Sequence, residues 1–160
     1  MKQQKLLIAV IGGHKCGRKT QKLAEELGRE IAKLGAILIC GGLGGVMQAA
    51  AKGAKEAGGT TVGILPTDDK NDANQFIDIP IATGLGYTRN TLVTTAADII
   101  IALPGEYGTL SEIAFALNAR KPVLGIGAWD IKGAIRAKTP QEAIKIIKQI
   151  VTTETRNDWK

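Results

Sequence analysis

The chain has 160 residues, of which 44% are hydrophobic and 22% charged, as is typical of one globular domain, here residues 1–160. Aromatic residues are only 4%, so stacking on bases is not an expected activity and nucleic acid is not an expected partner. The net charge of +6 fits either an anionic partner or a lysine-rich solvated surface. No apolar stretch is long enough to cross a membrane, and two cysteines without a secretory leader indicate the cytoplasm.

Six short apolar runs alternate with helical patterns along the chain. The expected strands are Leu6–Ile11, Ala36–Cys40, Thr61–Leu65, Ile77–Ile81, Ile99–Leu103 and Val123–Ile126. The expected helices are Lys19–Leu34, Val46–Ala57, Thr88–Ala97, Leu110–Ala119 and Pro140–Val151. Most of the strand runs show little polar alternation, as in strands buried on both faces. This order predicts a Rossmann-like, doubly wound parallel sheet in a three-layer α/β/α sandwich.

Nearly every expected strand ends in glycine or proline. The carboxyl ends of parallel strands share one edge of the sheet, and ligands of open α/β sheets bind there. Glycine lets backbone N–H groups converge, and the dipole of a following helix favours an anion. The sequence therefore predicts a phosphate cradle, with Gly13, Gly42 and Gly44 among its binding residues. The turns concerned are Gly12-Gly13, Gly41–Gly45, Thr83–Gly86 and Pro104–Thr109.

Two familiar nucleotide motifs fail on inspection. The segment Gly12–Thr20 resembles a P-loop, but Arg18 interrupts the required spacing, which disfavours an ATPase. The segment Gly42–Met47 lacks the third glycine of the dinucleotide fingerprint, and the next acidic residues, Asp68 and Asp69, fall in a loop. NAD binding is therefore poorly supported. No residue spacing is typical of a metal site, and no cofactor is expected.

Three further features leave alternatives open. His14, the single histidine, could contact phosphate or be incidental. Cys16 lies beside basic residues that could lower its pKa, or it is an ordinary loop thiol. The irregular stretch Pro66–Phe76 is either a binding loop or lid, or a mobile surface loop.

The segment that begins at Pro104 reads P-G-E-Y-G-T-L-S-E. It resembles the P-G-G-x-G-T-x-x-E motif of the Lonely Guy, or lysine-decarboxylase-like, family of cytokinin-activating phosphoribohydrolases. Gly41–Met47 is similar to a second glycine turn of that family, and Arg89 matches its arginine. The wider superfamily includes DprA-like and molybdenum cofactor carrier proteins. The resemblance covers roughly residues 7–126, most of the chain.

The resemblance implies a site as well as a fold. The backbone of Gly105, Gly108 and Thr109, with the Thr109 hydroxyl, is expected to hold a 5′-phosphate. Glu112 is expected to face the sugar and Arg89 to hold the substrate beside it, and these two are the expected catalytic residues. The implied reaction is hydrolysis of the N-glycosidic bond of a nucleoside 5′-monophosphate, with release of ribose 5-phosphate. A carboxylate suits that reaction, because it stabilises charge on the ribose or positions water.

Two positions depart from the family pattern. Glu106 replaces the second glycine of the motif, and Asn90 replaces the lysine that usually follows the arginine. Both point to the branch that is similar to molybdenum cofactor carrier proteins. The alternatives are thus a non-catalytic carrier of a phosphorylated ligand such as molybdenum cofactor, or an interaction module that has lost ligand binding. The resemblance also implies a homodimer or a higher homo-oligomer.

Overall fold

The computed structural model describes residues 4–157. The strands are β1 (Leu7–Ile11), β2 (Ile37–Cys40), β3 (Thr61–Leu65), β4 (Ile79–Ala82), β5 (Ile99–Ala102), β6 (Val123–Gly125) and β7 (Ile135–Arg136). The helices are α1 (Arg18–Lys33), α2 (Val46–Glu56), α3 (Arg89–Ala96), α4 (Tyr107–Asn118) and α5 (Pro140–Asn157), with short 3-10 helices η1 (Lys70–Asp72) and η2 (Gly86–Thr88). No helix in this range combines the length and apolar content needed to cross a membrane.

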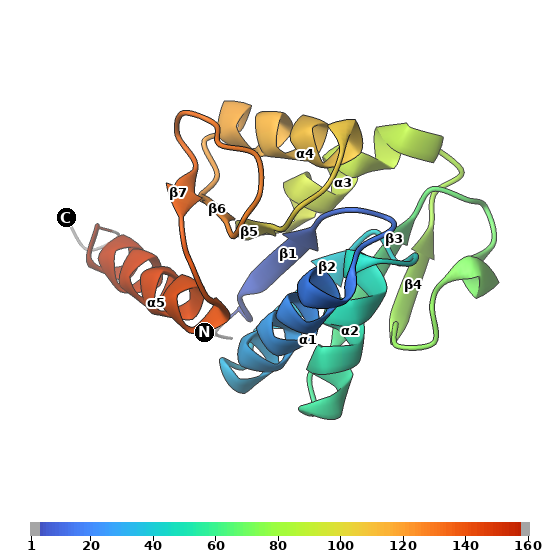
Figure 1. The fold of residues 1–160 in the computed structure, drawn as a ribbon, viewed down its shortest axis with the longest axis horizontal. Helices are drawn as coiled ribbons and strands as arrows, with labels where there is room; N and C mark the ends of the chain where they lie inside the picture. The colour runs from blue at the N-terminus through green and yellow to red at the C-terminus, as the bar shows by residue number, and fades with distance from the viewer. Residues whose placement is uncertain (1–3, 158–160) are drawn as a thin grey trace.

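All neighbouring strands of the seven-stranded sheet run parallel, in the order β4-β3-β2-β1-β5-β6-β7 (Figure 1). The chain moves outward from β1 to β4, then returns to the other side of β1 with β5. The carboxyl ends of β1 and β5 therefore flank the topological switch point, where ligands of such sheets bind. The predicted Rossmann-like fold class is confirmed.

Helices cover both faces of the sheet. Figure 1 shows α1, α2 and α5 on one side and α3 and α4 on the other. Along β1, Ile8 and Val10 join the apolar cluster beneath the first group, whereas Ala9 and Ile11 join the cluster beneath the second. Both faces of the central strands are therefore buried, which explains their unbroken apolar runs.

Three elements differ from the predictions. The fourth strand was expected at Ile77–Ile81, but β4 runs from Ile79 to Ala82 at the edge of the sheet, with Ile79 49% and Ile81 45% exposed. The two-residue strand β7 was not predicted, because it is too short to show a period. Helix α4 begins at Tyr107, so Gly108 and Thr109 lie in its first turn rather than before it. The anion motif is therefore part of a helix start.

Candidate functional site

The loops after β1, β2 and β5 meet through backbone atoms. The N–H of Gly13 donates to the carbonyl of Pro104 (2.9 Å), and the N–H of Val46 donates to the carbonyl of Gly13 (3.0 Å). A Cβ on Gly105 would lie 2.9 Å from the Gly13 nitrogen, and one on Gly45 would overlap the Gly13 carbonyl. Because only glycine permits this approach, these loops form one compact rim at the switch point.

Open backbone amides line this rim at the start of α4. Within the described residues, the N–H groups of residues 105–109 have no hydrogen-bond acceptor. The first bonded amide is that of Leu110, which donates to the carbonyl of Glu106 (3.1 Å). The Thr109 side chain is buried, and its hydroxyl makes no hydrogen bond within the same range. Five successive amides at the positive end of a helix dipole can bind an anion.

Glu106 occupies the motif position that is glycine in the Lonely Guy family, and its backbone conformation there is unstrained. Its φ of −96° is open to any residue, so the backbone does not require glycine here. Its side chain is exposed and forms no ion pair among the described residues. Glu106 therefore contributes an open N–H to the rim while its carboxylate is in solvent.

The start of α3 carries two buried polar side chains, Arg89 and Asn90. Arg89 is 8% exposed; its Nη1 donates to the carbonyl of Ile64 (2.9 Å), and its Nε has no partner. A Cβ on Gly41 would overlap Nη1, so that glycine makes room for the guanidinium. Asn90 is also buried, and its Nδ2 lies 3.7 Å from where a Cβ on Gly108 would be. Asn90 thus brings an unused donor close to the open amides, and Arg89 has a second unused donor at the start of the same helix.

Glu112 lies one turn into α4 and is 8% exposed. Its carboxylate has no hydrogen-bond or ion-pair partner within residues 4–157, although it interacts electrostatically with Arg89. Burial raises the pKa of Glu112 to about 8, against the opposing effect of the Arg89 charge. Burial also lowers the pKa of Arg89. A buried carboxyl and a buried guanidinium without full pairing mark a candidate functional site.

Cys40 is a neighbour of this pair that sequence reasoning missed. It ends β2, is fully buried, and interacts electrostatically with Arg89 and Glu112. Its sulfur accepts from the N–H of Gly42 (3.4 Å), and burial raises the pKa of its thiol to about 11. The thiol is therefore protonated at neutral pH and acts as a small apolar group near the Arg89–Glu112 pair. Its place inside an apolar run gave no sign of this role.

The predicted binding glycines take different places. The N–H of Gly13 is already bonded, so it is not free for a ligand. Gly42 is buried with φ of +77°, and its N–H is directed at the Cys40 sulfur. Gly44 has an N–H without an acceptor in the described range, and a Cβ there would lie 3.7 Å from the His14 ring. Gly13 and Gly42 thus shape the turns, whereas Gly44 retains a free donor.

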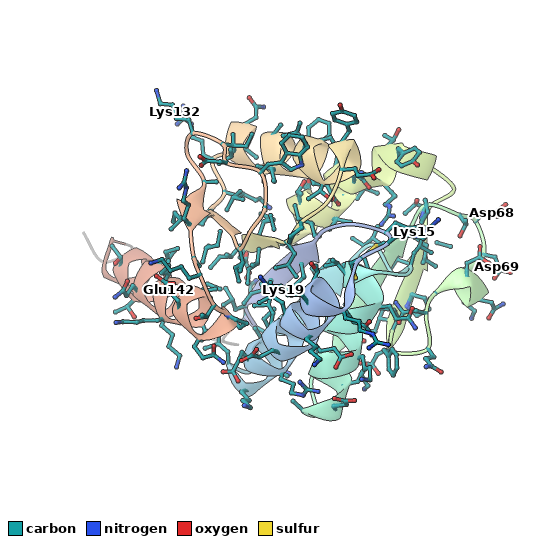
Figure 2. All side chains as sticks on the ribbon, in the orientation of Figure 1. Lys15, Lys19, Asp68, Asp69, Lys132 and Glu142 are labelled. Atoms are coloured by element: carbon teal, nitrogen blue, oxygen red, sulfur yellow. The ribbon has the colours of Figure 1, made fainter. Side chains whose placement is uncertain are left out.

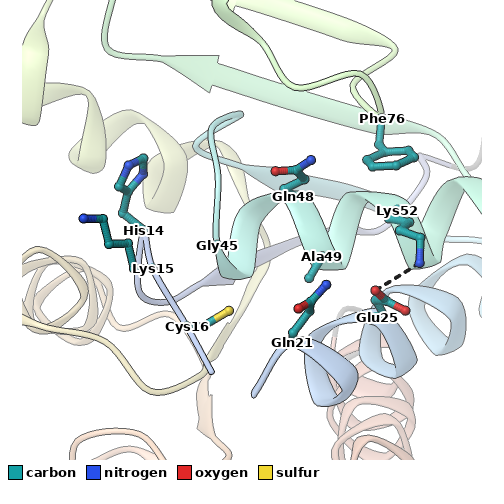
Figure 3. A pocket seen from close by; sticks show the side chains of 10 residues that line it. All are labelled: His14, Lys15, Cys16, Gln21, Glu25, Gly45, Gln48, Ala49, Lys52 and Phe76. Atoms are coloured by element: carbon teal, nitrogen blue, oxygen red, sulfur yellow. Dashed lines mark hydrogen bonds and ion pairs between the residues drawn. The ribbon is translucent and has the colours of Figure 1, made fainter. Parts of the chain in front are cut away.

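A second hollow of about 370 Å³ lies between the first halves of α1 and α2 (Figure 3). Its lining residues are His14, Lys15, Cys16, Gln21, Glu25, Gly45, Gln48, Ala49, Lys52 and Phe76. His14 and Cys16 line this hollow, whereas Arg89 and Glu112 do not. Burial raises the pKa of the Cys16 thiol, contrary to the activation that its basic neighbours suggested. Within residues 4–157, no three His, Cys, Asp or Glu side chains are grouped to hold a metal ion.

The Pro66–Phe76 loop borders the cleft at one end only. The Asn74 side-chain amide donates to the carbonyls of Gly42 (3.2 Å) and Leu43 (2.8 Å), which ties the loop to the turn after β2. Its acidic tip, Asp68 and Asp69, lies at the outer end of the molecule (Figure 2). The Asp69 carboxylate caps its own loop by accepting from the N–H of residue 71 (2.8 Å). The Asp69 carboxylate is therefore used within its own loop.

The buried Glu112 carboxyl predicts a pH-dependent stability. Because its pKa is 4.5 in an ordinary setting and about 8 here, the folded protein holds a proton that the unfolded chain releases. This stabilisation is complete below about pH 4.5 and is lost as the pH rises through about 8. Relative to wild type, we expect Glu112→Gln to gain up to about 4 kcal/mol of stability between about pH 5 and about pH 9.

Urea unfolding at the two pH values measures this gain. The matched control is Glu26→Gln, which alters an exposed glutamate on α1. Parallel pH dependence of wild type and Glu112→Gln would contradict a proton-holding Glu112.

The fold and these residues together define the class of this molecule. It is a Rossmann-like α/β protein with unbonded backbone N–H groups at residues 105–109, beside the incompletely paired Arg89 and Glu112. The chain belongs to the SLOG cluster4 family, whose sequence model matches residues 5–156. The superfamily resemblance found in the sequence is thereby confirmed.

Relatives with sequence similarity include a hydrolase. An uncharacterized protein of Archaeoglobus fulgidus is 45% identical over 138 residues, which are 86% of this chain and 91% of the relative. A cytokinin riboside 5′-monophosphate phosphoribohydrolase from Rhodococcoides fascians is 36% identical over 107 residues, 60% of this chain and 50% of the relative. The chain thus spans about half the length of that enzyme.

Solved structures show the same fold. The molybdenum cofactor binding protein from Rippkaea orientalis has a TM-score of 0.89 at 36% identity, covering 94% of this chain and 99% of that one. DNA processing protein A from Streptococcus pneumoniae has a TM-score of 0.73 at 17% identity, covering 88% and 61%. The second likeness concerns the fold alone.

Proposed function

We propose that the chain binds a nucleoside 5′-monophosphate-like ligand, with its phosphate on the open amides of residues 105–109. The observation that carries this proposal is the run of five unused N–H groups at the start of α4. The Thr109 hydroxyl lies in the same turn, and Arg89, whose Nε has no partner among the described residues, interacts electrostatically with Glu112 of α4. Phosphate oxygens accept several such bonds at once, and a helix N-terminus favours their charge.

The reaction we propose is hydrolysis of the N-glycosidic bond. Water adds to C1′ of the ribose, the bond to the base breaks, and its electron pair and a proton leave with the base. The products are ribose 5-phosphate and the free base. Ionised Glu112 would stabilise positive charge on the ribose or accept the proton of the attacking water. Arg89 would hold the phosphate or ribose in place.

The test is release of ribose 5-phosphate from a panel of nucleoside monophosphates. AMP is the first substrate, with CMP, GMP and UMP as members that vary only the base. Release by wild type that Glu112→Gln loses would support the hydrolase. If no member of the panel releases ribose 5-phosphate although AMP still binds, the hydrolase proposal is wrong and only the binding proposal remains.

The second candidate is a non-catalytic carrier of a phosphorylated ligand such as molybdenum cofactor. The likeness to a molybdenum cofactor binding protein extends over nearly the whole of both chains, further than the likeness to the hydrolase. Asn90 and Glu106, which depart from the hydrolase motif, favour this candidate as well. Protein purified from cells that make molybdenum cofactor would then carry a pterin chromophore, absent from Arg89→Met.

We also propose that the chain forms a homodimer or higher homo-oligomer through the face of α3 and α4. The large hydrophobic side chains exposed in the described range are Ile79, Ile81, Leu85, Tyr87, Leu92, Tyr107, Phe115, Trp129 and Ile135. They lie from β4 through α3 and α4 to β7, and none is on α1, α2 or α5. Leu92, Tyr107 and Phe115 lie on α3 and α4 themselves, and aromatic side chains are enriched in interfaces.

A charge placed on this face tests the assembly. Wild type is expected to exceed the monomer mass of 16.8 kDa in light scattering, and Phe115→Glu to shift toward that mass. Lys22→Glu on the exposed side of α1 is the matched control and should leave the mass unchanged. A monomeric wild type at high concentration would refute the interface.

The cytoplasm is the location we propose. Cys16 and Cys40 are both free thiols, and such thiols persist where the compartment is reducing. Cell fractionation tests this directly.

A further inference from the structure

Trp129 connects the β6–β7 segment to the anion-binding rim. Its indole Nε1–H donates to the carbonyl of Gly105 (3.0 Å). Its ring stacks on Tyr107, with centroids 6.2 Å apart and planes 25° apart. Trp129 is 39% exposed and Tyr107 79% exposed, so neither serves mainly to fill the core. The function proposed above does not use this connection.

The hydrogen bond determines the direction of one peptide group. In a trans peptide, the carbonyl and the following N–H point in opposite directions, and the described residues contain no cis bond. Because the Gly105 carbonyl is directed at Trp129, the N–H of Glu106 is directed away from it. That N–H is the second of the five open amides. The indole therefore sets which side of the peptide faces the rim.

Gly105 needs such a restraint. Glycine adopts many backbone conformations at little cost, so the peptide after it can rotate. Thr109 and the Gly13 nitrogen crowd the Cα of Gly105, but neither fixes the direction of the peptide that follows it. The stacked Tyr107 holds the indole plane from the other end of the same loop. Indole, carbonyl and stacked ring thus form a short brace around residues 105–107.

We propose that Trp129 is a positioning residue, whose indole N–H holds the Gly105–Glu106 peptide with the Glu106 N–H toward a bound phosphate. The inference rests on the proposed function, since it assumes that an anion binds to these amides. Trp129 does not touch the anion. It acts by presetting one donor, which lowers the ordering required when the ligand binds.

The first experiment compares the affinity of wild type, Trp129→Phe and Gln141→Leu for inorganic phosphate and AMP by calorimetry. Phenylalanine retains an aromatic ring for Tyr107 but has no N–H. Trp129→Phe is expected to weaken both ligands about fivefold, the effect of one neutral hydrogen bond. Gln141→Leu removes an exposed side-chain N–H donor on α5, where Gln141 donates to Glu26 of α1, and should bind as wild type does. Equal affinity of Trp129→Phe and wild type would overturn the inference.

A second variant separates the loss of the indole N–H from the loss of packing around the ring. Benzothienylalanine at position 129 keeps the shape of indole but replaces the N–H with sulfur. It should reproduce the affinity loss, and the amide NMR resonances of residues 105–107 should move without ligand. Normal affinity in this variant would show that the phenylalanine effect was packing and would refute the positioning role. If wild type binds neither phosphate nor AMP, the proposed function itself fails, an outcome distinct from equal binding by wild type and variants.

Discussion

Glu112→Gln is expected to reduce release of ribose 5-phosphate from AMP by at least about 100-fold, the usual contribution of a positioned acid or base. Glutamine keeps the shape of the side chain but can neither become negative nor accept a proton. Glu112 has no bonding partner among the described residues, so the change breaks no hydrogen bond or ion pair there. AMP binding should therefore persist, and the loss should appear in kcat. Glu26→Gln, the exposed control on α1, should retain full activity.

The pH profile adds a second readout of the same prediction. The reaction needs ionised Glu112, and burial raises its pKa to about 8. In the free protein, kcat/KM should therefore rise with pH and level off above about 8. A flat profile, or residual activity in Glu112→Gln equal to wild type, would move the chemistry away from this carboxylate. If wild type binds AMP but does not hydrolyse it, that result favours the carrier hypothesis.

Most of the fold could be predicted because its signals are local. Each central strand is a run of apolar residues, and glycine or proline follows it. The edge position of β4 could not be read from Ile79 and Ile81, because a periodic pattern does not reveal whether a helix covers a strand. Ile135 and Arg136 form a strand only through pairing with β6, which no local pattern predicts.

The candidate site also has features with a local sequence signal and features that depend on tertiary packing. Gly105, Gly108 and Thr109 lie in one short motif, so the phosphate loop was visible in the sequence. The approach of Arg89 to Glu112 depends on α3 packing beside α4, and only family resemblance pointed to it. The Trp129 bond to Gly105 spans 24 residues and had no sequence signal. Tertiary packing decided each feature that was missed.

Gly105→Ala is expected to reduce affinity for inorganic phosphate by about 100-fold, the equivalent of about two charge-assisted hydrogen bonds. The added Cβ would overlap the Thr109 hydroxyl and lie 2.9 Å from the Gly13 backbone nitrogen. Thr109 is 4% exposed and the other neighbour is backbone, so neither can simply move aside. The loop must shift, and with it the amides of residues 105–109. Overpacking of this kind destabilises a fold by about 1–3 kcal/mol.

The matched control is Gly17→Ala. Gly17 has an ordinary φ of −75°, and a Cβ there would meet no atom within 4 Å. Calorimetry with phosphate and thermal unfolding should be run on both variants. Wild-type affinity in Gly105→Ala would mean that the amides of this loop do not bind the anion, which would contradict the proposed site even if hydrolysis were observed. Affinity lost in Gly105→Ala but kept in Gly17→Ala, with both variants folded, assigns the anion to the start of α4. Binding would then depend on backbone donors that only glycine allows to converge, and the Glu106 side chain would be free to differ from the family motif.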